Sequence, residues 1–300
     1  MGTSKGVCRF CEVDSPTFKQ CSHTFPEALG NKWVFSRDEC DCCNALFSKY
    51  ETALVDCLKP LLTMGGVKGK KRIPQSGRTL GSTYIKHSNS GEPRRQSWHC
   101  KGESLSDYGP RLDQKTGLMD MKLPIPEIPF VPRYAYKALA KMGYALLPDD
   151  ELKNYAMLKD WLQNPKDQLN FPILDVQLSF ASIGNAPSTV SGVLLRRTDS
   201  ADEIPHILFI FSAGSICLQI DLMSDHLEDH ISLMPAGFVK LRWTSVIEGD
   251  QEGKAIKLTY SEPVTLNWNS SDPSPQPIES MNLKFNPITR VASFHPNLRG

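Results

Sequence analysis

Apolar positions recur along the chain with two different periods, and each period predicts a different kind of element. Between residues 47 and 61 apolar side chains are three and four apart, which predicts a helix, and Pro60 should kink or end it. The same spacing over 133–147 and 152–163 predicts a helical hairpin, in which Asp149, Asp150 and Glu151 should cap the second helix. Beyond residue 172, short apolar runs lie between clusters of Gly, Pro, Asn and Asp, which predicts strands. These strands are expected at 173–183, 190–197, 207–211, 216–222, 238–247, 255–260 and 281–285.

The order of these elements predicts an α+β protein with four regions. Residues 1–64 are rich in cysteine and end in the first helix, and residues 65–132 form a Gly-, Ser- and Pro-rich arm and linker with at most short strands. Residues 133–170 carry the helical hairpin. Residues 171–300 are expected to form a mostly antiparallel β domain, either a sandwich or a barrel.

The net charge of +1 hides a strongly basic segment. Residues 65–101 hold nine basic side chains against one acid, a local excess of 9 − 1 = +8. Such a segment is expected either to be a solvated linker or to contact the phosphates of a nucleic acid. The candidate phosphate contacts are Lys68, Lys70, Lys71, Arg72 and Arg78. On the second predicted helix Arg133, Lys137 and Lys141 lie four residues apart, which predicts a solvated basic face.

Seven of the nine cysteines lie in the first fifth of the chain. Charged residues interrupt the segment before Phe18, so no secretory signal is expected, and no apolar run reaches the roughly 20 residues that a membrane-spanning helix needs. A cytoplasmic protein is therefore expected. Thiols stay reduced in that compartment, and clustered cysteines then favour a metal site over disulfides.

Two pairs of these cysteines have the spacing of zinc ligands. Cys8 and Cys11 form one CxxC turn, Cys40 and Cys43 form another, and 28 residues separate the two turns. Four thiolates converging from two such turns would complete a closed, tetrahedral, structural Zn²⁺ site. Cys21 and Cys42 fall outside this spacing and are expected to be packing residues.

The residues between and after the two turns carry a resemblance to a known family. The segment Cys21-Ser-His-Thr-Phe-Pro-Glu-Ala-Leu-Gly-Asn31 lies between them, and the second turn runs directly into Asn44. Over residues 8–51 the chain resembles the HNH, or ββα-metal, endonucleases, most closely a subgroup with CxxC, (E/S)HxxPexLG and CxxCN motifs. The resemblance implies a zinc-braced β-hairpin followed by a helix and DNA as the substrate. It gives His23 the role of general base and Asn44 that of a ligand to one catalytic Mg²⁺ or Mn²⁺.

These residue types suit phosphodiester hydrolysis. A neutral imidazole can activate water near pH 7, and a divalent ion can neutralise charge at the phosphate. The second ring nitrogen of His23 is expected to be held by a backbone carbonyl or a similar partner.

Two positions depart from the family pattern. Ser22 stands where a metal-binding acid or histidine is usual, and Asn31 and Asp38 are the nearest candidates for the middle Asn of the HNH signature. Glu51 lies seven residues after Asn44, two helical turns along the same face, and could supply the missing carboxylate.

The sequence thus predicts a metal-dependent HNH endonuclease followed by a β region that binds a protein partner, forms a homo-oligomer or regulates activity. Bacterial defence against phage is one setting for such an enzyme, although no residue points to it. Two alternatives stay open. One is a zinc-ribbon nucleic-acid-binding protein with a degenerate, inactive HNH site, and the other is a sensor whose nuclease is silent until triggered.

Overall fold

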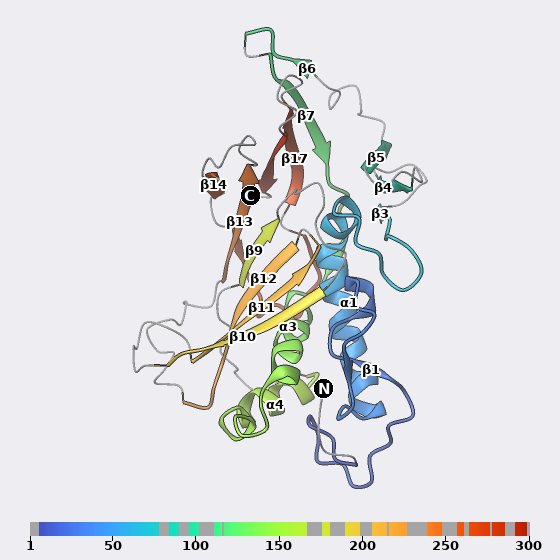
Figure 1. The fold of residues 1–300 in the computed structure, drawn as a ribbon, viewed down its shortest axis with the longest axis vertical. Helices are drawn as coiled ribbons and strands as arrows, with labels where there is room; N and C mark the ends of the chain where they lie inside the picture. The colour runs from blue at the N-terminus through green and yellow to red at the C-terminus, as the bar shows by residue number, and fades with distance from the viewer. Residues whose placement is uncertain are drawn as a thin grey trace.

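The computed structural model describes most of the chain as a mixed α+β protein, as the sequence predicts (Figure 1). The described residues are 6–77, 84–89, 96–101, 111–115, 117–166, 176–180, 190–198, 206–214, 216–226, 239–247, 257–260, 264–276, 278–285 and 292–298. The described α-helices are α1 (Asp41–Met64), α3 (Pro132–Leu146) and α4 (Ala156–Gln163). Within the described part, no helix is long and apolar enough to cross a membrane.

The N-terminal region consists of a small hairpin followed by the longest described helix. Strand β1 (Ser22–His23) pairs antiparallel with β2 (Phe35–Ser36), and His23 lies opposite Phe35. A single 3-10 turn, η1 (Glu27–Leu29), lies between the two strands. Helix α1 follows after four residues and continues past Pro60 to Met64, so Pro60 does not end the helix, and the alternative that it kinks the helix stays a prediction. The last turn is held because Leu61, Leu62 and Met64 are buried.

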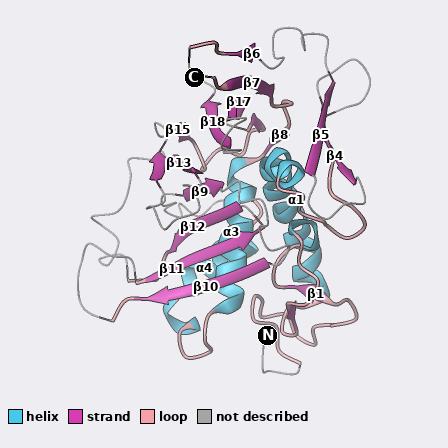
Figure 2. Cartoon of the chain, turned by 45° about the horizontal axis from the view of Figure 1, so that its top comes forward, coloured by secondary structure: helices cyan, strands magenta, loops and turns pink. Residues whose placement is uncertain are grey.

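Helix α3 lies between α1 and the central sheet and is covered on both sides (Figures 1 and 2). This position buries Lys137 and Lys141 completely, so the predicted solvated basic face is wrong for these two residues. The Nζ atom of Lys137 donates hydrogen bonds to the carbonyl oxygens of Trp161 and Asn164, both at 2.7 Å. A lysine spacing of four residues describes one face of a helix, but it does not say what covers that face.

Strands from the C-terminal half form the central sheet, whose order is β10-β11-β12-β9-β13-β14, with β15 paired to β13. Neighbouring strands are antiparallel except for β9 and β13, which are parallel. Most of these strands lie where the sequence predicts them. Their bounds are β9 Val176–Phe180, β10 Val190–Arg196, β11 Ile207–Ala213, β12 Ile216–Leu222, β13 Val239–Ile247, β14 Lys257–Tyr260 and β15 Val264–Leu266.

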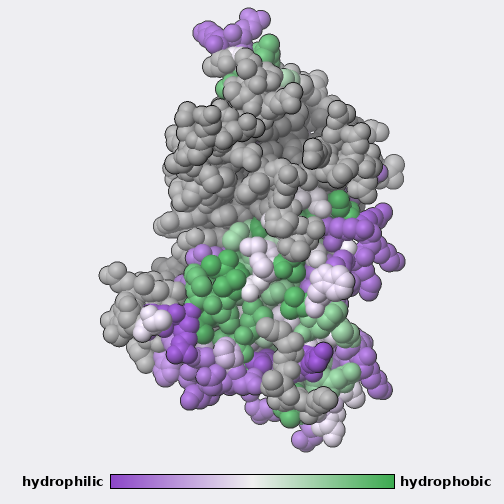
Figure 3. Space-filling model, in the orientation of Figure 1, coloured by the Kyte–Doolittle hydropathy of each residue, from purple (hydrophilic) through white to green (hydrophobic). Residues whose placement is uncertain are grey.

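Alternate residues of β11 and β12 are buried, and this inner face packs on a helix (Figure 2). A Cβ atom placed on Gly143 of α3 would lie 2.8 Å from Leu222 and 3.1 Å from Phe209, so helix and sheet approach closely. This layer is therefore sheet on helix, which differs from the expected sandwich or barrel. On the outer face Val193 and Leu195 are exposed, and Figure 3 shows an apolar area over these strands.

Smaller sheets join the segment before α3 to the end of the chain. Strand β7 pairs with β17 in the sheet β18-β17-β7-β6, β8 pairs with β16, and β3-β4-β5 form a third sheet. Strand pairing thus joins the predicted arm to the predicted C-terminal β domain. The limits of these two regions stay predictions. The bounds are β3 Ser76–Gly77, β4 Tyr84–Asn89, β5 Gln96–Lys101, β6 Arg111–Leu112, β7 Met119–Pro124, β8 Pro129–Phe130, β16 Ser274–Pro275, β17 Ile278–Phe285 and β18 Ala292–Leu298.

The helical hairpin is present, but its second helix is capped from outside. A 3-10 turn, η2 (Leu152–Asn154), precedes α4, and the carboxylate of Asp225 accepts hydrogen bonds from the backbone N–H groups of Ala156 and Met157, both at 2.9 Å. The expected caps have other partners, since Asp149 accepts a hydrogen bond from Arg9 and Glu151 accepts one from Arg196. The prediction of a local cap is wrong because a residue distant in sequence reaches the helix end.

Candidate functional site

The four cysteines that the sequence pairs are brought together in the structure. The Sγ atoms of Cys8, Cys11, Cys40 and Cys43 all lie within 4.8 Å of one another. Cys40 and Cys43 lie at the start of α1, and their partners come from the loop before β1. This arrangement is compatible with the predicted structural zinc site, since four thiolates at one point suit a tetrahedral ion.

The hydrogen bonds within the cluster already favour a thiolate. The Sγ atoms of Cys8 and Cys43 are hydrogen-bonded at 3.7 Å, and this bond lowers the pKa of Cys8 to about 4. The same bond is the main cause that raises the pKa of Cys43, while burial raises the pKa of Cys11 to about 11. Zinc binding would require the thiols to lose their protons.

A contact to the cluster from α4 has no signal in the sequence. Gln163 Nε2 donates to Cys43 Sγ at 3.2 Å, so the helical hairpin touches the candidate zinc site. Cys21 and Cys42 are exposed, and the expectation that they pack in the interior is wrong.

His23 ends strand β1, as the resemblance implies, and lies among side chains from the hairpin. Its Nδ1 atom lies 3.4 Å from Asn31 Nδ2, its Nε2 atom lies 3.9 Å from Glu27 Oε2, and its ring centroid lies 4.9 Å from that of Phe35. Burial lowers the pKa of His23 below its usual value, which keeps the imidazole neutral near pH 7. The ring nitrogens thus face the Asn31 and Glu27 side chains, and the expectation that a backbone carbonyl or a similar partner holds the ring stays a prediction.

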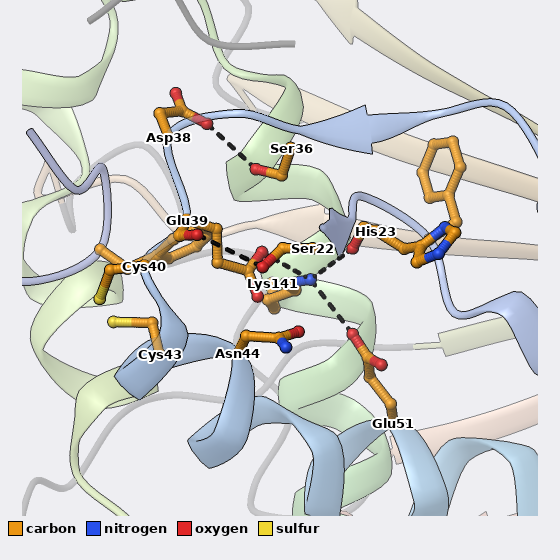
Figure 4. Close-up of polar contacts among 12 residues, drawn as sticks. Ser22, His23, Ser36, Asp38, Glu39, Cys40, Cys43, Asn44, Glu51 and Lys141 are labelled. Carbon is orange, nitrogen blue, oxygen red and sulfur yellow. Dashed lines mark hydrogen bonds and ion pairs between the residues drawn. The ribbon is translucent and has the colours of Figure 1, made fainter. Parts of the chain in front are cut away.

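Asn31 closes the loop that joins β1 to β2. It is fully buried, and its Nδ2 atom donates to the carbonyl oxygens of Phe25 and Val34, both at 2.8 Å. Its Oδ1 atom accepts from the backbone N–H groups of Trp33 and Val34. Asp38, the other candidate for this position in the signature, instead accepts hydrogen bonds from Arg9 and Ser36, away from His23 (Figure 4).

The remaining predicted residues are engaged with other groups of the chain. Ser22 is buried and its hydroxyl donates to the backbone carbonyl of Glu39, and Asn44 donates to Gln20 at 3.0 Å on the protein surface. Glu51 accepts a hydrogen bond from Lys141 at 3.1 Å (Figure 4). Each of these polar groups already has a partner within the chain. The assignment of Asn44 and Glu51 as ligands of a catalytic divalent ion therefore stays a prediction.

Two residues that the sequence analysis missed, Glu39 and Lys141, lie at the centre of the site (Figure 4). Lys141 Nζ lies 2.9 Å from the carbonyl oxygen of His23 and 3.0 Å from Glu39 Oε2, and the side chains of Lys141 and Glu39 are both 0% exposed. Burial raises the pKa of Glu39 to about 7. Burial also acts to lower the pKa of Lys141, but the charges of Glu39 and Glu51 outweigh it and raise that pKa. Only the folded chain brings these groups together.

The surface beside the hairpin that carries His23 has an open hollow and an exposed aromatic side chain. An open hollow beside the hairpin is lined by Phe18, Lys19, Gln20, Cys21, Phe35, Ser36, Arg37 and Glu39. Trp33, in the hairpin loop, is 84% exposed. No role is expected for Trp33 from the sequence, although its place between Asn31 and β2 could have drawn attention to it.

The start of the basic segment lies next to this loop. Lys32 Nζ donates to the carbonyl oxygen of Gly69 at 2.7 Å, and Lys70 Nζ lies 3.5 Å from Glu27, the neighbour of His23. The side chains of Lys68, Lys70, Lys71 and Arg72 are exposed, and Arg78 lies outside the described residues. Four of the five predicted phosphate contacts therefore lie on the surface.

Comparison of the chain with protein-family models, with curated proteins and with solved structures finds no match in any of the three. Any function assigned to the site therefore depends on its own geometry and chemistry.

Proposed function

We propose that the N-terminal region is an HNH-type endonuclease module that hydrolyses phosphodiester bonds of DNA with His23 as the general base. The observation that carries the proposal is the order β1, β2, α1, with His23 ending β1 and cysteines of one cluster on both sides of the hairpin. A zinc ion bound there would fix the hairpin relative to the helix, and with it the imidazole.

His23 has the properties that a general base needs. Its lowered pKa leaves a neutral ring at pH 7, able to take a proton from a water molecule that attacks the phosphate. Asn31 Nδ2 lies 3.4 Å from the ring Nδ1 and is itself held by four backbone groups of the hairpin loop, so its packing against the ring would limit how the ring turns. Because Ser22, Asn44 and Glu51 each have a hydrogen-bond partner within the chain, the proposal assigns no step to a catalytic divalent ion.

Substrate binding is assigned to the exposed groups around the hairpin. The basic side chains at 68–72 would contact backbone phosphates, which gives salt-dependent affinity with little sequence preference. Trp33 and the aromatic residues Phe18 and Phe35 of the hollow would stack on bases.

A second candidate function is nucleic-acid binding without chemistry by a zinc-stabilised module. The observation that favours it is the ion pair between Glu51 and Lys141, together with the buried Ser22 hydroxyl. In that case the fold would retain a nuclease framework whose reactive groups are engaged with one another.

Cleavage and binding measured on the same DNA separate the two candidates. Zinc-loaded protein is incubated with supercoiled plasmid in Mg²⁺, in Mn²⁺ and in a chelator too weak to remove the zinc, and filter binding is measured in parallel. The nuclease proposal predicts nicking by the wild type and unchanged binding without nicking by His23→Ala. Binding without nicking by both proteins under every condition would favour the second candidate.

A further inference from the structure

One position beside His23 is surrounded by oxygen atoms from two elements and the segment between β2 and α1, and it is filled by a cation from α3 (Figure 4). The oxygens are the His23 carbonyl from β1, a Glu39 carboxylate oxygen from the residue before Cys40, and a Glu51 carboxylate oxygen from α1. They lie 2.9, 3.0 and 3.1 Å from Lys141 Nζ, respectively. Lys141 belongs to α3, which is part of the helical hairpin rather than of the N-terminal region.

The oxygens at this position are those that hard divalent cations prefer, namely carboxylate and backbone carbonyl oxygens. Two carboxylates face one ammonium, so the cluster carries more negative than positive charge when both are ionised. The Glu39 carboxylate is fully buried, and in the described part of the chain it makes the ion pair to Lys141 but no hydrogen bond. A buried carboxylate in that state is costly unless a cation compensates it.

We propose that the Lys141 ammonium and a divalent cation are alternative occupants of this position formed by the His23 carbonyl, Glu39 and Glu51. While α3 is docked, the lysine excludes the ion, because an ion at Glu51 would have to break a buried ion pair. When Lys141 withdraws, the same oxygens are free to bind the ion. The assignment differs from the predicted Asn44 and Glu51 pair, since it uses Glu39 and a backbone carbonyl. Only the effect of the ion on cleavage rests on the proposed nuclease function.

This exchange would connect the accessory region to the nuclease site. The cation that neutralises the site comes from α3, and α3 packs on the central sheet through Gly143. A partner that shifts α3 would therefore move Lys141 and open the position. In the alternative in which the nuclease is silent until triggered, the silent state would be the one with Lys141 in this position.

Mn²⁺ binding to the full-length, zinc-loaded protein tests the proposal without any nucleic acid. Binding is measured by electron paramagnetic resonance of free Mn²⁺ for the wild type, Lys141→Met and Lys137→Met. Lys137 is a matched control, because it is buried on the same helix one turn earlier and its Nζ donates to backbone carbonyls. Lys141→Met is expected to bind one Mn²⁺ at least about tenfold more tightly than the wild type and Lys137→Met.

A double variant tests whether Glu39 binds the ion. A polar variant controls for the packing that is lost with the lysine side chain. Glu39→Gln with Lys141→Met should lose the added affinity, and Lys141→Gln, whose amide can still donate to His23, should show the same gain as Lys141→Met. The proposal is overturned if neither Lys141→Met nor Lys141→Gln binds Mn²⁺ more tightly than the wild type. It is equally overturned if the double variant binds Mn²⁺ as tightly as Lys141→Met. It is also overturned if Lys141→Met and Lys141→Gln both stay unfolded with and without Mn²⁺. Because no cleavage is measured, failure of the nuclease proposal leaves these outcomes unchanged.

Discussion

The ammonium of Lys141 lies 2.9 Å from the backbone carbonyl of His23, across 118 positions of sequence. A residue of the helical hairpin therefore completes the environment of the candidate base. Gln163 makes a similar link to the candidate zinc site from α4. The N-terminal region is thus not self-contained, and its site is assembled with elements from the middle of the chain.

The cysteine cluster predicts that two neighbouring cysteines contribute very differently to zinc binding and to stability. Cys40→Ser should lose zinc and lower the free energy of unfolding by about 4 kcal/mol or more, because binding of structural zinc is itself folding free energy. Cys42→Ser, two residues away, changes an exposed side chain and should keep zinc and stability. Zinc content and thermal melting check both variants. Equal zinc content in Cys40→Ser and the wild type would show that the cluster is not a zinc site.

Asn31 should matter far more for stability than Asn44. Asn31→Ala leaves four buried or half-buried backbone groups of the hairpin loop without their partner, which should cost about 2–4 kcal/mol. Asn44→Ala removes one hydrogen bond at the surface and should cost less than about 0.5 kcal/mol. Urea denaturation of the two variants measures the difference. Similar losses in both would contradict the role given to Asn31.

The pKa of His23 predicts how cleavage and stability depend on pH. Burial lowers this pKa below its usual value of 6.5, so the folded state favours the neutral ring and the cleavage rate should rise with pH to a plateau whose inflection lies below 6.5. The stability that His23 contributes should be complete above pH 6.5 and be lost as pH falls through the lowered pKa.

The charge of Glu27 opposes this shift, so Glu27→Gln should move the inflection to still lower pH. Glu12→Gln, which changes an exposed acid paired with Lys159, should leave it in place. NMR titration of the His23 ring measures the pKa directly. A value at or above 6.5 in the wild type would argue against the burial effect.

Trp33 should contribute to nucleic-acid affinity but not to stability. It is 84% exposed, so Trp33→Ala should change the free energy of unfolding by less than about 0.5 kcal/mol. Loss of one stacked base should weaken binding to single-stranded DNA by about tenfold. Val193→Ala, an exposed apolar residue on β10, serves as the control. Fluorescence anisotropy gives both affinities, and equal affinity in the two variants would remove Trp33 from the binding surface.

Local features of the fold and site could be predicted from the sequence, because they depend on spacing along a few residues. The two CxxC turns converge as expected, the helix follows the second turn, and the alternating strands β10, β11 and β12 lie where predicted. His23 ends a strand, as the resemblance implies.

The features that sequence missed depend on which elements pack together. Nothing local distinguishes a buried lysine such as Lys141 from a solvated one, since the groups around its ammonium come from β1, α1 and the residue before Cys40. The Asp225 cap on α4 likewise comes from the far end of a strand. The sequence carries no signal for Glu39, because a single acid before a cysteine belongs to no periodic pattern.

The most direct test of the central claim is the single-turnover rate at which zinc-loaded protein nicks supercoiled DNA, measured for His23→Ala and His206→Ala. The two histidine side chains have the same exposure, 23%, and each lies near one glutamate, Glu27 and Glu151 respectively, so a general effect of losing an imidazole would appear in both. We predict a rate at least about 100-fold lower for His23→Ala and a rate close to the wild type for His206→Ala. Equal rates for the two variants would contradict the assignment of His23 as the general base.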